Sequence, residues 1–421
     1  GRIRVEPILI KKSSWLGRNH SYLQFGLFYL GLCSRILFVN SSRWALATFL
    51  LFTIGAAILI GFLYGGKTWC NYFCPMAPVQ KIYGEPRGLF NSTAHQGSRR
   101  ITQSMCRTIT PAGKEQSACV GCQTPCIDID SERTYWDGVT KPDRQLIYYG
   151  YLGLVIGYFC YYYLYAGNWD YYMSGIWTHE HNQLGKLLSP GFYLFESAIP
   201  IPKLVAVPMT LAFFGGGSYF LGRFLEKQYK AHLQYHRRHI QHALLRHRMF
   251  TLCTFIVFNF FFVFGGRYFV GLLPIFFQYC FEALIVLVST LWFYRTWKRN
   301  PERYLRESLA NSLRNQLSML RLDVSRFVEG RSLEDLDPNE IYILAKILPG
   351  FTQEKRLQTY RGVLLEALEG GYISSSSSLE VLLKMRLELD ISDQDHERIL
   401  AEVGIENPEL FSSFVSQPLF L

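Results

Sequence analysis

Six of the ten cysteines lie in one polar stretch, and their spacing indicates a shared metal site. These six are Cys70, Cys74, Cys106, Cys119, Cys122 and Cys126. The first two form a C-x3-C-P pattern directly after an apolar run, and the last three form a C-x2-C-x3-C pattern. Thiolates are soft ligands, which select iron–sulfur clusters or zinc over hard cations. The other four cysteines stand singly in apolar runs, where we interpret them as small core residues.

One complete [4Fe–4S] cluster is the metal group that this spacing favours. Such a cluster needs four thiolates, and three can come from one tight loop. The predicted ligands are Cys74, Cys119, Cys122 and Cys126. Two clusters would need eight thiolates and the stretch has six, so Cys70 and Cys106 are expected to be spare, structural or alternative ligands. A second cluster with partly non-cysteine ligands stays open as an alternative.

A four-cysteine zinc site with a purely structural role in the loop is the other metal hypothesis, because zinc also accepts C-x2-C pairs. Zinc sites typically combine two C-x2–4-C pairs a dozen or more residues apart. Pro75, the three-residue spacers and the apolar run before Cys70 favour iron instead. Unmetallated thiols are the third alternative.

Two segments also resemble a known family. Gly65–Pro75, with the sequence GGKTWCNYFCP, looks like the membrane-edge motif of polyferredoxin-type membrane proteins. That family serves nitrate and nitrous-oxide reduction and cytochrome oxidase assembly. Cys119–Cys122, with Ile127–Asp130 shortly after it, is similar to the family's ferredoxin loop. The resemblance covers roughly Ala45–Asp130 and implies electron transfer through [4Fe–4S] clusters. The full C-x2-C-x2-C-x3-C-P run and a second membrane-edge C-x3-C-P are absent.

The elements that must position the cysteines are predicted to be membrane helices. The 421 residues are 49% hydrophobic and 16% aromatic, with a mean hydropathy of +0.07, which is too apolar for an ordinary soluble domain. A spanning helix needs about 20 apolar residues. Six runs approach this length: Tyr22–Val39, Ala45–Tyr64, Ile147–Ala166, Ile201–Gly222, Met249–Val270 and Leu272–Tyr294. The fold class is therefore mainly α, a polytopic membrane protein with about six spans.

Charge predicts the orientation of these spans. Lys and Arg concentrate before the first run, in residues 65–146, in residues 223–248 and after residue 294. Gly167–Pro200 holds only Lys186 against three acidic residues. The positive-inside rule then places both termini and the cysteine-rich loop on the cytoplasmic side of the membrane. We expect this to be an inner bacterial membrane, either plasma or thylakoid-type. Anionic lipid is the expected counter-charge for the net charge of +10, so no nucleic-acid partner is needed. Tyr and Trp around Tyr158–Tyr172 predict an aromatic belt at the outer interface.

The chain after residue 300 is predicted to be a soluble helical domain. The expected helices are Pro301–Glu329, Glu340–Leu348, Thr352–Glu369, Leu379–Asp390 and Ser392–Val403. Ser392 and Asp395 predict a helix N-cap, and the serine run Ser374–Ser378 predicts a break. The predicted domains are residues 1–64 with two spans, 65–146 with the cysteine loop, 147–299 with four spans, and 300–421. Because the chain begins with glycine, we expect it to be part of a longer protein.

Histidines offer two weaker metal hypotheses. His232, His236, His239, His242 and His247 lie in one basic segment, and the first three share one face on a helix, but the Arg and Lys between them favour a solvated basic helix on lipid headgroups. His179 and His181 flank Glu180 on the predicted outer side, where two histidines could share a metal.

The function predicted from the sequence is single-electron transfer at the cytoplasmic face through the [4Fe–4S] cluster, with a redox partner protein. Two alternatives stay open: a redox or oxygen sensor that signals through the C-terminal helical domain, and a membrane scaffold with a structural zinc site. Whether the chain is an enzyme is left open. No nucleophile–base pattern and no glycine-rich nucleotide loop is recognisable, so it is expected to be at most the electron-transfer component of an oxidoreductase system.

Overall fold

The computed structural model is mainly helical and forms two compact units. One unit contains the described residues up to Lys298, and the other contains those from Arg299 onward. The structure describes residues 8, 10, 14–40, 42–64, 68–87, 107–109, 115–117, 130–180, 184–194, 197–236, 241–319, 331, 333–347, 352–369 and 376–406.

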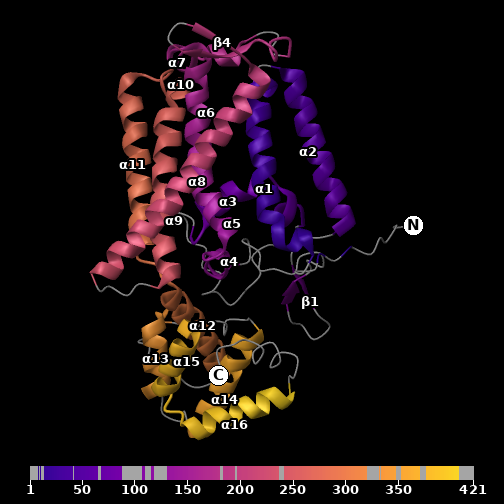
Figure 1. The fold of residues 1–421 in the computed structure, drawn as a ribbon. Coiled ribbons are helices and arrows are strands. Elements are labelled where there is room, and N and C mark those ends of the chain that lie inside the picture. Colours follow the sequence, from indigo (N-terminus) through magenta and orange to yellow (C-terminus); the bar gives the residue numbers. More distant parts are fainter. Residues whose placement is uncertain are drawn as a thin grey trace. The chain divides into compact units, whose positions relative to one another are not determined.

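Five helices of the first unit are long and apolar enough to cross a membrane. They run in similar directions in Figure 1. Two of them continue into a π-helical segment at the C-terminal end. They are α1 (Trp15–Ser34) with η1 (Arg35–Val39), α2 (Arg43–Tyr64), α8 (Lys203–Tyr235), α9 (His242–Asn259) with η6 (Phe260–Gly265), and α11 (Ile275–Trp297).

The predicted span Ile147–Ala166 is helical but is not among these five. The chain passes from α5 (Pro142–Gln145) through η4 (Leu146–Gly150) into α6 (Tyr151–Ala166) without a break. Eight tyrosines lower the apolar character of the segment from Leu146 to Ala166. Many of its side chains are buried in the core of the unit. Five spans are thus supported by length and composition, and the sixth stays a prediction.

Glycines allow α8 to pack closely against α6 and against η4, which precedes α6, in the centre of the unit. A Cβ atom on Gly153 would collide with the carbonyl oxygen of Phe214, and one on Gly222 would collide with the Tyr149 ring. The Ser218 hydroxyl donates a hydrogen bond to the Tyr149 carbonyl at 2.7 Å. Small residues at helix interfaces are typical of membrane helix packing.

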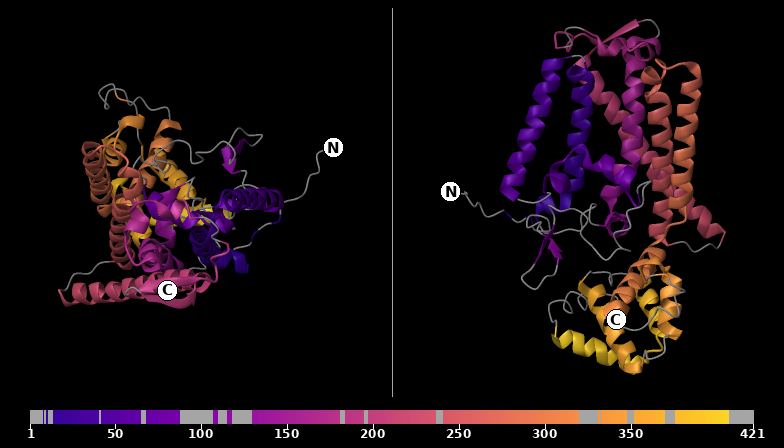
Figure 2. Two further views of the ribbon diagram at one scale, coloured as in Figure 1. Left: turned by 90° about the horizontal axis from the view of Figure 1, so that it is seen from above. Right: turned by 180° about the vertical axis from the view of Figure 1, so that it is seen from behind.

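Helix α2 contrasts with this core, because none of its residues is buried. It lies at the edge of the first unit in Figure 1 and in the rear view of Figure 2. Leu51 and Phe52 on this helix are 70% and 74% exposed. Such a surface suits lipid better than water.

One end of the first unit carries the segment predicted to face outward. It contains α7 (Asp170–Met173), η5 (Ile176–Thr178), the antiparallel hairpin β3 (Pro190–Leu194) and β4 (Ser197–Pro202), and α10 (Arg267–Val270) (Figure 1). Tyr161, Tyr162 and Tyr172 of the predicted aromatic belt are buried here, whereas Tyr163 and Trp169 are partly exposed. Many of these aromatic residues therefore form a packed core, and only part of the group can serve as an interfacial belt.

The opposite end carries Cys70 and Cys74. It contains η2 (Trp69–Phe73), α3 (Ala77–Gly84), α4 (Ser131–Gly138) and α5. A short antiparallel hairpin, β1 (Arg107–Ile109) with β2 (Glu115–Ser117), belongs to the cysteine-rich stretch. Its register pairs Arg107 with Ser117.

The second unit is helical, as predicted. Its elements are α12 (Pro301–Met319), η7 (Leu333–Asp335), α13 (Pro338–Ile347), α14 (Gln353–Glu369), α15 (Ser376–Glu388) and α16 (Asp393–Glu406). The Ser392 hydroxyl caps α16 by accepting from the Asp395 backbone N–H at 3.1 Å, which confirms the predicted N-cap. The predicted break over Ser374–Ser378 is wrong in its second half, because α15 begins at Ser376. Serine is favoured near a helix start, so the run opens a helix there.

Candidate iron–sulfur site

Cys70 and Cys74 lie on a π-helical turn that ends at a proline. The Cys74 backbone N–H donates to the Trp69 carbonyl at 2.8 Å, closing the wide turn of η2. Cys74 then leaves the helical region with φ −59° and ψ 121°. Pro75 explains this change, because the residue before proline is driven away from helical ψ values. Single π-helical turns are frequently found at functional sites.

The turn presents its cysteines and anchors the residue between them. Cys70 is exposed and Cys74 half-buried, and both carry a thiol. Tyr72 is only 1% exposed, and its ring contacts the His20 ring of α1 with the centroids 5.1 Å apart. A buried aromatic anchor therefore fixes a turn that carries one exposed and one half-buried cysteine.

Helix α1 also holds the backbone of this turn. The buried Gln24 amide donates from Nε2 to the Cys70 carbonyl at 3.1 Å. Its Oε1 atom accepts a hydrogen bond from Lys81 Nζ of α3 at 3.4 Å. Gln24 of α1 thus links the cysteine turn to helix α3, which follows the turn.

The two ends of residues 88–129, the part of the chain that contains Cys106, Cys119, Cys122 and Cys126, are linked by side-chain contacts. Arg87 ends the described segment before it, and its Nε atom lies 2.9 Å from Glu132 Oε2 in α4, which follows the stretch. Trp136 donates to the other oxygen of Glu132 at 3.2 Å, and the Ser131 hydroxyl donates to the Pro86 carbonyl at 3.2 Å. These contacts form a base that joins the described residues on either side of residues 88–129.

A buried ion pair reinforces that base. Arg144 of α5 pairs with Glu85, and both side chains are almost fully buried. Arg144 also donates to the Thr134 carbonyl at 3.3 Å. Glu85 strongly favours the charged form of the guanidinium, and the pKa of Arg144 lies above its ordinary value although burial opposes this.

Three of the four predicted ligands, Cys119, Cys122 and Cys126, lie outside the described residues, and so does the alternative ligand Cys106. Cys70 and Cys74 are the two that the structure places. In the described part of the chain, no group of three or more His, Cys, Asp and Glu side chains could hold a metal ion. The full ligand set therefore stays a prediction.

The structure corrects the interpretation of the basic histidine segment. Helix α8 ends at Tyr235, and a new helix, α9, begins at His242. His247 is fully buried instead of solvated. Its Nδ1 atom lies 2.9 Å from the Tyr135 hydroxyl, and its Nε2 atom lies 2.9 Å from the Thr296 carbonyl oxygen. Sequence reasoning missed this role because both partners are distant in the chain.

Glu180, in the segment predicted to face outward, is engaged by hydroxyl and ammonium groups. The hydroxyls of Tyr171 and Tyr165 donate to it at 2.6 and 2.8 Å. Lys186 Nζ lies 3.0 Å from Oε1, and Lys203 Nζ lies 3.8 Å from Oε2. These groups outweigh burial and lower the pKa of Glu180 to about 2. His181, which was predicted to share a metal with His179, lies outside the described residues. The Glu180 carboxylate between them is already surrounded by other groups.

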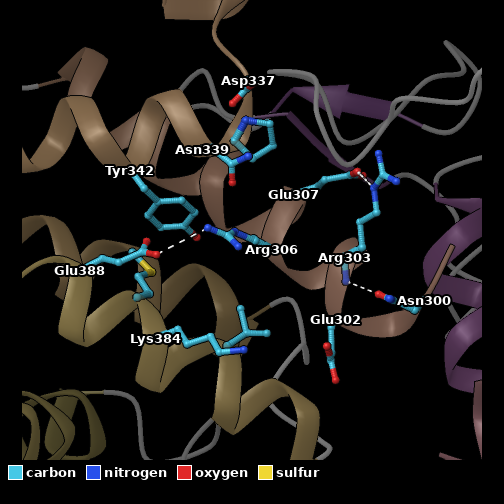
Figure 3. Close-up of a pocket in the computed structure, with 13 residues that line it drawn as sticks. Asn300, Glu302, Arg303, Arg306, Glu307, Asp337, Asn339, Tyr342, Lys384 and Glu388 are labelled. Carbon is cyan, nitrogen blue, oxygen red and sulfur yellow. Dashed lines mark hydrogen bonds and ion pairs between the residues drawn. The ribbon is translucent and has the colours of Figure 1, made fainter. Parts of the chain in front are cut away.

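A separate pocket of about 470 Å³ lies within the second unit (Figure 3). Four of its charged side chains form two ion pairs: Arg303 lies 3.1 Å from Glu307, and Arg306 lies 3.5 Å from Glu388. The Arg306 guanidinium also lies over the Tyr342 ring, 5.7 Å from its centroid. This internal balance favours a structural role for these charges over the binding of an ion.

One comparison with known proteins bears directly on the cysteine turn. Residues 46–92 match a family described as a 4Fe-4S binding domain. The match covers most of α2, the η2 turn with both described cysteines, and α3. No curated protein and no solved structure matches the chain. The family match supports an iron–sulfur protein.

Proposed function

We propose that the chain is a membrane-anchored iron–sulfur protein that transfers single electrons at the cytoplasmic face. Cys74, Cys119, Cys122 and Cys126 would hold one [4Fe–4S] cluster. The observation that carries this proposal is the match to a 4Fe-4S binding domain over the segment that presents the Cys70 and Cys74 thiols. Soft thiolates are the ligands that such clusters take.

The clamped base explains how distant cysteines could reach one cluster. Cys74 lies before the Arg87–Glu132 pair in the chain, and Cys126 lies shortly before α4, which contains Glu132. Holding the two ends of a long loop together removes much of the entropy cost of bringing its ligands together. Cys70 and Cys106 remain spare or alternative ligands in this proposal.

The cluster would supply a one-electron redox centre. The described residues would position the turn: Tyr72 anchors it in the core, and Gln24 holds its backbone through the Cys70 carbonyl. Hydrogen bonds, burial and nearby charge tune the potential of such a centre.

Membrane anchoring is proposed from the helices. Five are long and apolar enough to span, and α2 exposes its apolar side chains along its length. Lys and Arg flank the cysteine-bearing end of the first unit, which supports a cytoplasmic location for that end under the positive-inside rule. Anionic lipid and a redox partner protein are the proposed partners.

A redox or oxygen sensor is the second candidate, because the C-terminal unit is a compact helical body suited to binding a partner. Sustained electron flux from a one-electron donor would favour transfer. A change in partner binding on oxidation without flux would favour sensing. The zinc scaffold is the third candidate.

The deciding measurement is iron, zinc and acid-labile sulfide per chain in anaerobically purified protein, with electron paramagnetic resonance (EPR) spectra before and after dithionite. About four iron and four sulfide with a signal in the reduced state is the expected result. Cys122→Ala should lose the cluster, whereas Cys280→Ala, which alters an exposed cysteine of α11, should keep it. Zinc without sulfide would overturn the proposal and leave a structural scaffold.

A further inference from the structure

A pocket of about 430 Å³ on the first unit is lined by residues of α5, α8 and α9. Its lining combines four cations with one carboxylate, one amide and two phenylalanines. These are Arg223, Lys227, Lys230 and Arg246, then Glu226 and Gln145, and lastly Phe220 and Phe224. The family match over residues 46–92 includes none of them, so this pocket lies outside the matched domain.

Buried contacts fix the inner side of this pocket. Glu226 Oε2 accepts hydrogen bonds from Gln145 Nε2 at 2.7 Å and from the Tyr149 hydroxyl at 2.9 Å. The other carboxylate oxygen of Glu226 lies 2.8 Å from Arg246 Nε. All four residues are buried, so the arrangement is held by the core of the unit. The one carboxylate among the lining residues is thus already paired, and it does not offset the remaining cations.

The remaining three cations form the outer side of the pocket. Arg223, Lys227 and Lys230 are exposed and follow one another at intervals of four and three residues, which puts them on one face of α8. Among the described residues, no Asp or Glu oxygen lies within 4 Å of their charged nitrogen atoms. Arg223 instead donates to the Tyr219 hydroxyl at 3.3 Å. An anion that enters the pocket would therefore meet three cations without a competing carboxylate.

Apolar side chains adjoin these cations on the side of the predicted membrane core. Phe220 and Phe224 are 69% and 56% exposed, which suits lipid chains better than water. Helix α8 has 33 residues, whereas about 20 are enough to cross a hydrocarbon core of about 30 Å. Counted from Lys203 at the other end of α8, this crossing ends at the turn that contains Phe220 and Arg223. The pocket thus lies at the depth where acyl chains meet headgroups.

We propose that this pocket binds an anionic glycerophospholipid, with the headgroup phosphate at Arg223, Lys227 and Lys230 and the acyl chains against Phe220 and Phe224. The inference rests on the proposed membrane anchoring and is independent of the cluster. Phosphate oxygens accept charge-assisted hydrogen bonds from arginine and lysine. Basic pockets between membrane helices on the cytoplasmic side are typical sites for lipid headgroups. The proposal thus narrows the general attraction to anionic lipid to one place on the protein.

The test is native mass spectrometry of the full chain in detergent micelles, titrated in turn with phosphatidylglycerol and with phosphatidylcholine. Phosphatidylglycerol should bind more tightly, because the choline cation of the other lipid would face the same basic residues. Lys227→Gln with Lys230→Gln should weaken phosphatidylglycerol binding by about 30-fold, since each cation near an anionic headgroup contributes about fivefold. Lys227→Arg with Lys230→Arg keeps both charges and should bind like the wild type.

The matched control is Arg295→Gln with Lys298→Gln, which removes the same charge from exposed positions at the C-terminal end of α11. It should bind phosphatidylglycerol like the wild type. Equal losses in the two glutamine double variants would show only a general effect of surface charge and would overturn the inference. Phe220→Ser should also weaken lipid binding, because the acyl chains lose an apolar contact.

Two further outcomes separate this inference from its alternatives. If inorganic phosphate displaces the lipid and Phe220→Ser binds it as tightly as the wild type, the pocket is a site for soluble anions and the inference is wrong. Equal binding of the two lipids by a chain that inserts into vesicles would overturn the lipid site alone. A chain that stays in solution without detergent and does not insert would instead refute the proposed membrane anchoring.

Discussion

Arg87 and Glu132, which flank residues 88–129 with four cysteines between them, form an ion pair at 2.9 Å. Glu132 is 1% exposed and Arg87 17%, so the pair is protected from solvent screening. We expect Glu132→Ala to lower the iron and sulfide content well below that of the wild type, because the loop that holds three predicted ligands loses its closed base. Metal and sulfide analysis after a chelator challenge measures this.

The matched control for that variant is Glu380→Ala, which removes the exposed pair with Lys384 at 3.2 Å. Exposed pairs of this kind contribute little. Equal cluster content in Glu132→Ala and wild type would show that the clamp does not support ligand assembly.

The Glu85–Arg144 pair predicts a strong effect on stability. Arg144→Met leaves the Glu85 carboxylate buried without its cation, and breaking a buried pair in this way costs about 3–5 kcal/mol. Equilibrium unfolding in detergent micelles should show this loss of free energy. The double variant Glu85→Met with Arg144→Met should recover part of it, since no buried charge is left alone. A double variant as unstable as Arg144→Met would contradict this account.

His247 is predicted to be a structural anchor. Tyr135→Phe removes the hydroxyl that lies 2.9 Å from His247 Nδ1 and leaves a buried polar atom without that partner. The expected loss is about 1–3 kcal/mol of unfolding free energy. Tyr294→Phe changes a largely exposed tyrosine of α11 and should cost almost nothing. Thermal melting of the two variants side by side tests this, and equal melting temperatures would argue against the anchor.

The lowered pKa of Glu180 predicts that the stability of the protein depends on its ionisation in acid. Its pKa falls from 4.5 to about 2 on folding, so its contribution is complete above pH 4.5 and is lost as the pH falls through about 2. Glu180→Gln should therefore melt below the wild type at pH 6, and the gap should narrow between pH 4.5 and 2. A gap that stays constant over this range would mean that ionisation of Glu180 does not contribute.

Local patterns predicted more of this fold than of its site. Apolar runs identify helices because hydropathy is a property of neighbouring residues, and Arg43–Tyr64 was found almost to the residue. Helix ends were less predictable: α8 continues to Tyr235, well beyond the predicted end at Gly222, because arginine and lysine do not stop a helix.

The contacts that position the candidate site lay beyond prediction. Gln24 and Cys70 are 46 residues apart, and Tyr135 and His247 are 112 residues apart. Nothing in one sequence marks such pairs, because each partner is a common residue type in an ordinary local context. The roles of Cys106, Cys119, Cys122 and Cys126 rest on spacing and stay predictions.

Close packing of α6 against α8 gives the last prediction. Gly153 faces α8 so tightly that an added methyl group would meet the Phe214 carbonyl and the Ser218 side chain. Backbone cannot move aside as a flexible side chain can, so Gly153→Ala should separate the helices and lower stability by about 1–3 kcal/mol.

Gly216 offers the matched control, because it lies in α8 and a Cβ atom there meets nothing within 4 Å. Gly216→Ala should be neutral or stabilising by up to about 1 kcal/mol, since alanine favours a helix over glycine. The helix propensity gain is the same at both sites, so the difference between the two variants isolates the packing cost. Thermal melting in one detergent measures it, and matching melting temperatures would show that α6 and α8 are not packed as closely as this.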